Sequence, residues 1–203
     1  TEIVISMILS EAVTRSLASA APKSDSFDMD KFRRHSMATA TLSRMLIKSL
    51  YSSNGDLQDR AFIAALLHDL GKLIAASHFS EPFAAAVKKA HTEKIPLYEA
   101  EKELMGTDHT ELGSFLAEWW ALPHFITTAI EQHHKLQANL IEPDIVPAVY
   151  LANELSYQFG FGCNGEKQER SIDQAVLDKF IITDEGLEIL QIETERLVNA
   201  LCS

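Results

Sequence analysis

Apolar residues recur along most of the chain at spacings of three and four positions, the period of a helix with one buried face. Prolines and glycines divide this pattern, and Gly106 and Gly160 close two of its segments. Helices are predicted at residues 2–20, from Asp28 or Asp30 to 50, from a turn at 52–56 to 77, and at 82–91, 96–106, 108–122, 123–134, 144–159, 172–180 and 184–201, with a loop at 160–171. No segment alternates like a strand, so we predict an all-α fold, a compact multi-helix bundle.

The length and composition fit one domain over residues 1–203, because 46% of the residues are hydrophobic and can form a core. No run is long enough to span a membrane, no signal peptide is recognisable, and the two cysteines form no metal motif. We therefore expect a cytoplasmic protein that does not act at a membrane. The net charge of −11 argues against broad nucleic-acid binding, and we interpret Lys31, Arg33 and Arg34 as a solvated helix face.

One nearly all-apolar stretch, AFIAALLHDLGKLIAA at residues 61–76, carries His68 and Asp69 side by side. A helix that is apolar on every side is usually buried, and a buried carboxylate or imidazole is costly unless it has a partner. Alanines precede the pair on the same helix face, which allows other helices to approach closely. The sequence therefore predicts that His68 and Asp69 meet polar groups inside the protein.

Other polar residues also fall on the core-facing sides of predicted helices. Together with the pair they form a set from five helices: His35, His68, Asp69, His109, His133, His134 and Asn153. Taken singly, each has an ordinary explanation, namely a hydrogen-bonded core histidine, a buried ion pair, a helix-end cap or an amide bonded to nearby backbone. Taken together, neutral imidazoles and a carboxylate suit a divalent ion such as Fe, Mn, Zn or Ni.

A metal site of this kind also suggests chemistry. Two ions that share Asp69 as a bridging ligand could activate water for the cleavage of a phosphate ester. Lys72 follows His68 by about one helical turn and could hold the phosphate, so Asp69 and Lys72 are the candidate catalytic residues. The alternative for Lys72 is a side chain whose ammonium extends to solvent.

The order H…HD…H…HH…D, with Asn153 at the final position here, resembles that of the HD superfamily of metal-dependent phosphohydrolases, especially its HD-GYP group. The phrases FIAALLHDLGKL, YEAEKELMGTDHTELGSFLAEWWALP, AIEQHH and LANEL are closer to the HDOD domain, a related output domain of bacterial signalling proteins. This resemblance runs from about Phe32 to Leu155. It implies an N-terminal helical lobe of which residues 1–20 are only the tail, so we expect that residues upstream of Thr1 are missing.

The resemblance also implies two metal positions that share one aspartate. The first would use His35, His68, Asp69 and a final aspartate that is Asn153 here, and the second would use Asp69, His109, His133 and His134. A neutral amide binds a divalent ion more weakly than a carboxylate does. The segment after His134 also lacks the glutamate and the GYP sequence of the HD-GYP group, which argues against hydrolysis of cyclic dinucleotides.

Three functions remain open on these features. The first is a regulatory HDOD signalling domain with weak or no catalysis, a metal site in its core and protein partners in a signalling pathway. The second is an active metal-dependent phosphohydrolase that acts on a phosphate ester or nucleotide. The third is a structural interaction module that docks a partner through the segment around Trp119 and Trp120.

Overall fold

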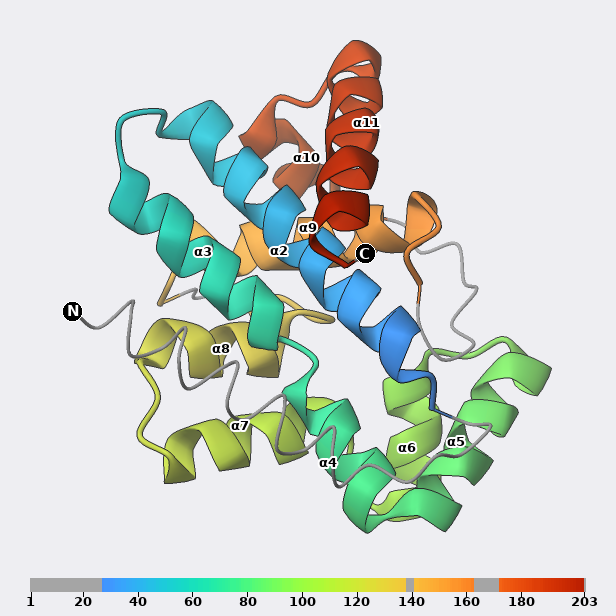
Figure 1. The fold of residues 1–203 in the computed structure, drawn as a ribbon. Coiled ribbons are helices and arrows are strands. Elements are labelled where there is room, and N and C mark those ends of the chain that lie inside the picture. Colours follow the sequence, from blue (N-terminus) through green and yellow to red (C-terminus); the bar gives the residue numbers. More distant parts are fainter. Residues whose placement is uncertain (1–26, 138–140, 163–171, 203) are drawn as a thin grey trace.

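The computed structural model describes residues 27–137, 141–162 and 172–202, and the elements within these ranges are all helices (Figure 1). The predicted all-α fold is therefore confirmed for this part of the chain. The predicted helix at 2–20 and most of the predicted loop at 160–171 lie outside the described residues.

Helix α2 runs across the bundle, and α3 lies beside it (Figure 1). Helix α2 (Met29–Leu50) begins after Asp28, whose side chain accepts a hydrogen bond from a first-turn amide, so Asp28 rather than Asp30 is the cap. Helix α3 (Gly55–Leu67) packs along α2, and α9 (Ile145–Gln158) packs against both. Their apolar faces, with those of α8, form the larger core of the domain.

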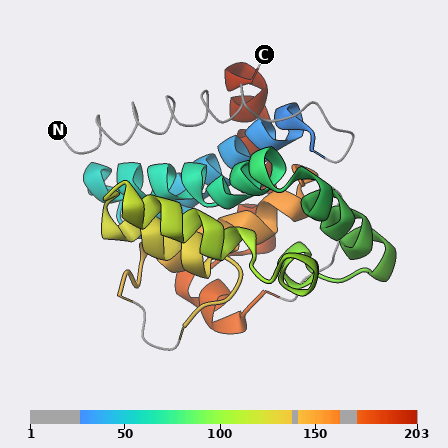
Figure 2. The same cartoon turned by 90° about the horizontal axis from the view of Figure 1, so that it is seen from below.

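A second group of helices continues from the end of α3. Helix α4 (Leu70–His78) packs against α7 (His109–Trp119), and α7 packs against α8 (His124–Gln132). Helices α5 (Ser80–Glu93) and α6 (Leu97–Met105) pack on each other and extend from one end of the bundle (Figure 2). A separate apolar cluster holds α4, α5 and α6 together.

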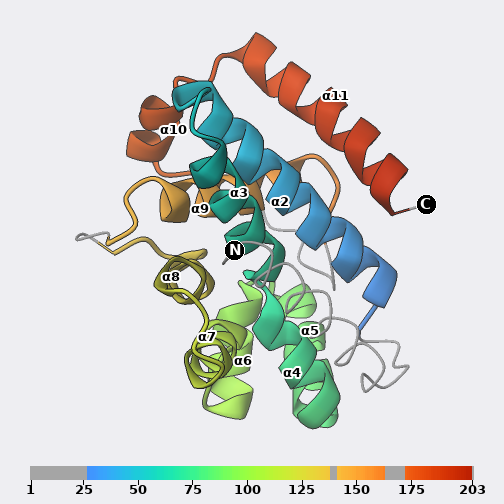
Figure 3. The ribbon, with the colours of Figure 1, turned by 60° about the vertical axis from the view of Figure 1, so that its left-hand side comes forward.

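Two further helices complete the described chain. Helix α10 (Gln174–Phe180) contacts α2 and α9, and α11 (Asp184–Leu201) lies along the outer side of α2 (Figure 3). Since α2 is covered by α3, α9 and α11, most of its faces are buried. Within the described ranges, none of the helices combines the length and the apolar content needed to cross a bilayer.

The prediction of one continuous helix to residue 77 is wrong at one point, because the helix is interrupted at His68 and Asp69. Helix α3 ends at Leu67, and Asp69 has φ −97° and ψ 14°, outside the helical region, before α4 begins at Leu70. The stretch contains no proline and is apolar apart from His68, Asp69 and Lys72, so its pattern did not predict the break. Because of this interruption, the Asp69 side chain points at residues from several other helices.

Gly71 shows why α4 and α7 can meet at this break. A β-carbon added to Gly71 would lie 1.8 Å from the His109 carbonyl oxygen, and one added to Gly113 would lie 2.8 Å from an Ile130 methyl group. Only glycine permits such an approach of two backbones. Asp108, where the predicted helix begins, caps α7 by accepting hydrogen bonds from the Thr110 and Glu111 amides, and His109 becomes the first residue of that helix.

Candidate metal centre

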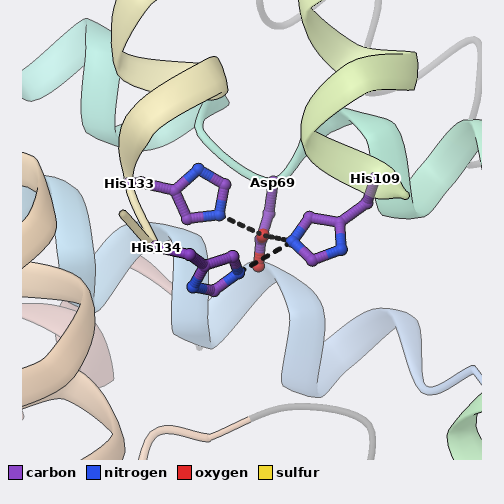
Figure 4. Close-up of side chains that lie close together, drawn as sticks. All are labelled: Asp69, His109, His133 and His134. Atoms are coloured by element: carbon purple, nitrogen blue, oxygen red, sulfur yellow. Dashed lines mark hydrogen bonds and ion pairs between the residues drawn. The ribbon is translucent and has the colours of Figure 1, made fainter. Parts of the chain in front are cut away.

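The Asp69 carboxylate lies between two groups of imidazoles. Its Oδ1 atom is 3.6 Å from Nε2 of His109 and 3.4 Å from Nε2 of His133 (Figure 4). His134 completes this side, because its Nε2 atom is 2.9 Å from Nε2 of His109. One nitrogen from each of these three histidines and one Asp69 oxygen lie within 4.8 Å of one another. We call these four residues the Oδ1 side of the centre.

The second Asp69 oxygen faces a different group. Oδ2 is 3.4 Å from Nε2 of His35, 3.3 Å from Nε2 of His68 and 2.9 Å from Nζ of Lys72. His35, His68 and Asp69 also offer three ligand atoms within 4.8 Å of one another. We call these three residues, with Lys72, the Oδ2 side. The structure therefore brings every predicted histidine to the same aspartate.

The centre is closed off from solvent. His35, His68, Lys72, His109 and His133 have 0% of their surface exposed, Asp69 has 1%, and His134 alone among the histidines of the centre is half-buried. Charged and polar groups at this depth are stable only when they are paired with each other or bind an ion. The alternative prediction for Lys72, an ammonium that extends to solvent, is therefore wrong.

Hydrogen bonds at the outer ring nitrogens fix the orientation of four imidazoles. Nδ1 of His35, His68 and His133 lies 3.1, 2.6 and 2.8 Å from the carbonyl oxygens of Phe161, Ala65 and Ile130. Nδ1 of His109 lies 2.5 Å from Oε2 of Glu101. A carbonyl or carboxylate oxygen accepts hydrogen bonds, so we assign the proton of each neutral ring to Nδ1, which leaves the Nε2 lone pair directed at Asp69.

This arrangement fits a divalent ion. On the Oδ1 side, the Nε2 atoms of His109 and His134 are only 2.9 Å apart. Such an arrangement is repulsive unless a proton or a metal ion lies between the nitrogens. Imidazoles whose second nitrogen donates to an oxygen are the usual form of metal-ligating histidines. Asp69 together with histidines of the centre would hold the ion, and the bound ion would supply Lewis acidity there.

Burial and neighbouring charge shift the pKa values of four groups in the centre. Burial lowers the pKa of His133 to about 3, and it also lowers the pKa of His35 although Asp69 acts against it. Burial alone would raise the pKa of Asp69, but the adjacent His68 ring and the Lys72 ammonium hold it well below its usual range. Burial acts to lower the pKa of His109, and the adjacent Glu101 carboxylate raises it above the usual value. Asp69 is therefore ionised.

Sequence reasoning missed Glu101, which has 0% of its surface exposed. Its Oε2 atom accepts hydrogen bonds from both the amide and Nδ1 of His109, at 3.0 and 2.5 Å. Glu101 shares a helical stripe with the buried residue Leu97, so the criterion that selected His35, a polar side chain on an apolar face, would also have selected Glu101.

Tyrosines and a serine around the histidines were missed as well. The Tyr157 hydroxyl accepts a hydrogen bond from Lys72 Nζ at 3.3 Å, and its ring lies 4.8 Å from that of His35. Tyr98 stacks on His134 with 5.0 Å between the ring centroids. The Ser156 hydroxyl lies 3.1 Å from His35 Nδ1. All three are common surface or boundary residue types, and the sequence carried no signal that separated them from others.

Asn153 is placed in the core by α9, one turn before Ser156. It has 0% exposure, and neither Oδ1 nor Nδ2 has a hydrogen-bond partner among the described residues. The ordinary explanation for Asn153, a bond to nearby backbone, is therefore wrong for the part of the chain that the structure describes. A buried amide in this state is a costly feature that a structural role does not explain.

Two surface interpretations can also be compared with the structure. Lys31 and Arg33 form ion pairs with Asp28 and Asp30 on the exposed part of α2, as expected for a solvated helix face. Trp119 is 75% exposed, while Trp120 is half-buried against the smaller core. Trp119 therefore remains available to a partner, and Trp120 has a packing role.

The fold and the site together place the chain in one class of protein: all-α domains in which several histidines surround one buried aspartate. Comparison with known families gives the particular member: a sequence profile of the HDOD domain matches residues 2–136. The chain belongs to the HDOD domain family. The match begins before the resemblance described above and ends before α9, the helix that carries Asn153.

Solved structures share this fold. An HDOD domain protein of unknown function from Geobacter sulfurreducens matches with a TM-score of 0.77 and 22% identity, over 100% of this chain and 70% of its own. A candidate signal-transduction protein of Marinobacter aquaeolei VT8 matches with a TM-score of 0.80 and 20% identity, over 100% and 44%. A candidate phosphohydrolase of Shewanella amazonensis SB2B matches with a TM-score of 0.59 and 22% identity, over 98% and 63%.

A sequence relative extends the comparison. An uncharacterized protein of Treponema pallidum (strain Nichols) is 27% identical over 126 residues, which are 62% of this chain. The chain spans 24% of the length of that relative. At these identities the solved structures establish the fold alone, and the family rests on the sequence profile.

Proposed function

We propose that this chain is a regulatory HDOD domain that binds a divalent metal ion at the Asp69 centre and has little or no phosphohydrolase activity. The observation that supports it most is the burial of an ionised carboxylate whose two oxygens both face imidazole nitrogens. The chemistry of these donors suits Fe, Mn, Zn or Ni. A phosphate ester in solution has no direct contact with Asp69, His109 or His133, because all three side chains are buried.

Metal binding at this centre would have a regulatory consequence. The four ligands of the Oδ1 side come from the junction of α3 and α4, the start of α7 and the end of α8, so one ion would couple the positions of these helices. A partner or ligand that favours one arrangement of the helices would then change metal affinity, and metal binding would change affinity for the partner in return. Protein partners in a signalling pathway are part of this proposal.

Metal analysis together with a hydrolysis assay tests the proposal. The wild-type chain and Asp69→Asn are purified without oxygen, loaded with Mn²⁺ or Zn²⁺, and assayed with bis-p-nitrophenyl phosphate and a cyclic dinucleotide. Asp59→Asn is the matched control, because Asp59 is a half-exposed carboxylate paired with Arg44. We expect the wild type and Asp59→Asn to retain metal, Asp69→Asn to lose it, and none of the three to show enzyme-like turnover. A wild type that binds no metal would refute the proposal.

An active phosphohydrolase is the second candidate, and the position of Lys72 favours it. Its ammonium lies beside Asp69 and the Tyr157 hydroxyl, where a positive charge could stabilise a phosphoryl group. Metal-dependent hydrolysis that disappears in both Asp69→Asn and Lys72→Met, and persists in Asp59→Asn, would establish this activity and replace the regulatory proposal.

A further inference from the structure

The two sides of Asp69 differ in the charges that surround them. On the Oδ2 side, the Lys72 ammonium forms an ion pair with the carboxylate at 2.9 Å. On the Oδ1 side, the Glu101 carboxylate stands behind His109 and accepts hydrogen bonds from its amide and its Nδ1 atom. A fixed positive charge therefore adjoins one oxygen, and an additional carboxylate supports the ligands of the other.

Burial and its contacts hold the Lys72 ammonium beside Asp69. Its side chain has 0% exposure, its Nζ donates to Tyr157 at 3.3 Å, and it extends from the first turn of α4, close in the chain to Asp69. A divalent ion bound to Oδ2 would stand a few ångströms from this ammonium, and in a buried site the repulsion is only weakly screened. Expelling Lys72 instead would leave a buried ammonium without its carboxylate.

The Oδ1 side has the better set of donors. It offers four ligand atoms, from Asp69, His109, His133 and His134, against three from Asp69, His35 and His68. Four nitrogen and oxygen donors complete a tetrahedral shell. The Glu101 bond to Nδ1 of His109 orients that ring and makes its Nε2 a stronger donor, as carboxylates do for ligating histidines in general.

We propose that the centre takes a single divalent ion, held by Asp69 Oδ1, His109, His133 and His134, and that the Lys72 ammonium serves as the built-in cation for Oδ2. In this view Lys72 is neither a phosphate ligand nor a catalytic residue. It keeps a second ion away from His35 and His68, and it makes the centre mononuclear. This inference rests on the proposed metal-binding function and adds its stoichiometry and its location.

Metal counting in two charge variants tests the role of Lys72. The full 203-residue chain is saturated with Zn²⁺ or Mn²⁺, freed of unbound metal and analysed for metal per chain. Lys72→Met removes the ammonium and keeps much of the volume, whereas Lys72→Arg keeps the charge. We expect about one ion per chain in the wild type and in Lys72→Arg, and about two in Lys72→Met. Two ions in the wild type, or one in a folded Lys72→Met, would overturn the inference and leave the metal-binding function intact.

A measurement on the wild type locates the ion even if Lys72→Met fails to fold. Histidine ring nitrogens are labelled and their NMR shifts are followed during addition of Zn²⁺. We expect the shifts of coordination at Nε2 of His109, His133 and His134, with Nε2 of His35 and His68 remaining uncoordinated. Coordination at His35 and His68 would overturn the inference. No coordination at any of the five histidines would overturn the proposed function together with it.

Discussion

The two sides of Asp69 use the same residue types and have opposite surroundings. On both sides, imidazoles donate through Nδ1 and direct Nε2 at a carboxylate oxygen. The Oδ2 side is neutralised by a side chain of the protein itself, Lys72, and its histidines rest on backbone carbonyls and a serine hydroxyl. The Oδ1 side has a buried carboxylate, Glu101, as its support. We therefore expect the groups around the ligands, more than the ligand types, to decide where an ion binds.

The Oδ1 side depends on the close contact between α4 and α7, and Gly71→Ala is the variant with the largest expected effect. The new β-carbon would lie 1.8 Å from the His109 carbonyl oxygen, so the helices must separate and His109 must move. We expect a loss of about 3 kcal/mol in the free energy of unfolding, at the upper end for overpacking because the clash is with backbone. Denaturant unfolding followed by circular dichroism measures this loss.

Gly55→Ala is the control for the glycine comparison. An added β-carbon at Gly55 meets nothing within 4 Å, so the free energy of unfolding should change by less than about 0.5 kcal/mol. If Gly71→Ala is as stable as Gly55→Ala, the contact between α4 and α7 is looser than the structure describes and cannot fix His109.

The carboxylate support of His109 is the next test. Glu101→Gln keeps the size of the side chain but removes the charge that adjoins His109, and we expect affinity for Zn²⁺ to fall by about 10- to 100-fold. Isothermal titration calorimetry measures the affinity, with Glu103→Gln as the matched control because Glu103 pairs with Lys89 at the surface. An equal loss in both variants would mean that net charge, and no specific bond to His109, controls binding.

The sequence predicted the helices well where local signals end them. Asp28 and Asp108 cap their helices in the structure, and His35, His109 and the other predicted histidines meet at one carboxylate. It did not predict the break at Asp69, because the periodic apolar pattern continues through this stretch and no proline interrupts it. Contacts between separate helices could not be predicted either. Periodicity places a residue such as Glu101 on one face of its helix but does not show which residues of other helices lie opposite.

The support of His35 gives a smaller effect for the same kind of substitution. In Ser156→Ala, the Nδ1 proton of His35 keeps the Phe161 carbonyl as an acceptor at 3.1 Å, and only the serine hydroxyl is lost. We expect Zn²⁺ affinity to change by less than about threefold, which is about 0.7 kcal/mol. A loss in Ser156→Ala as large as that in Glu101→Gln, measured by the same titration, would place the ion on the Oδ2 side and reverse the comparison.

Asn153→Asp separates two explanations for the single ion. The Oδ2 side lacks a second ion either because position 153 is a neutral amide or because Lys72 already supplies a cation. Asn153 is buried and its amide atoms have no hydrogen-bond partner among the described residues, so an aspartate there adds charge without breaking an existing bond.

If the Lys72 ammonium is decisive, Asn153→Asp should still bind about one ion per chain, and only the double variant with Lys72→Met should bind about two. Metal analysis after saturation measures the ratio, with Asn199→Asp as the control for added charge because Asn199 accepts a hydrogen bond from Arg34 at the surface. A second ion in Asn153→Asp alone would show that the missing carboxylate is what leaves the Oδ2 side without metal. In that case the Lys72 ammonium pairs with Oδ2 only because the carboxylate at position 153 is missing. A metal ion would displace it once that carboxylate is restored.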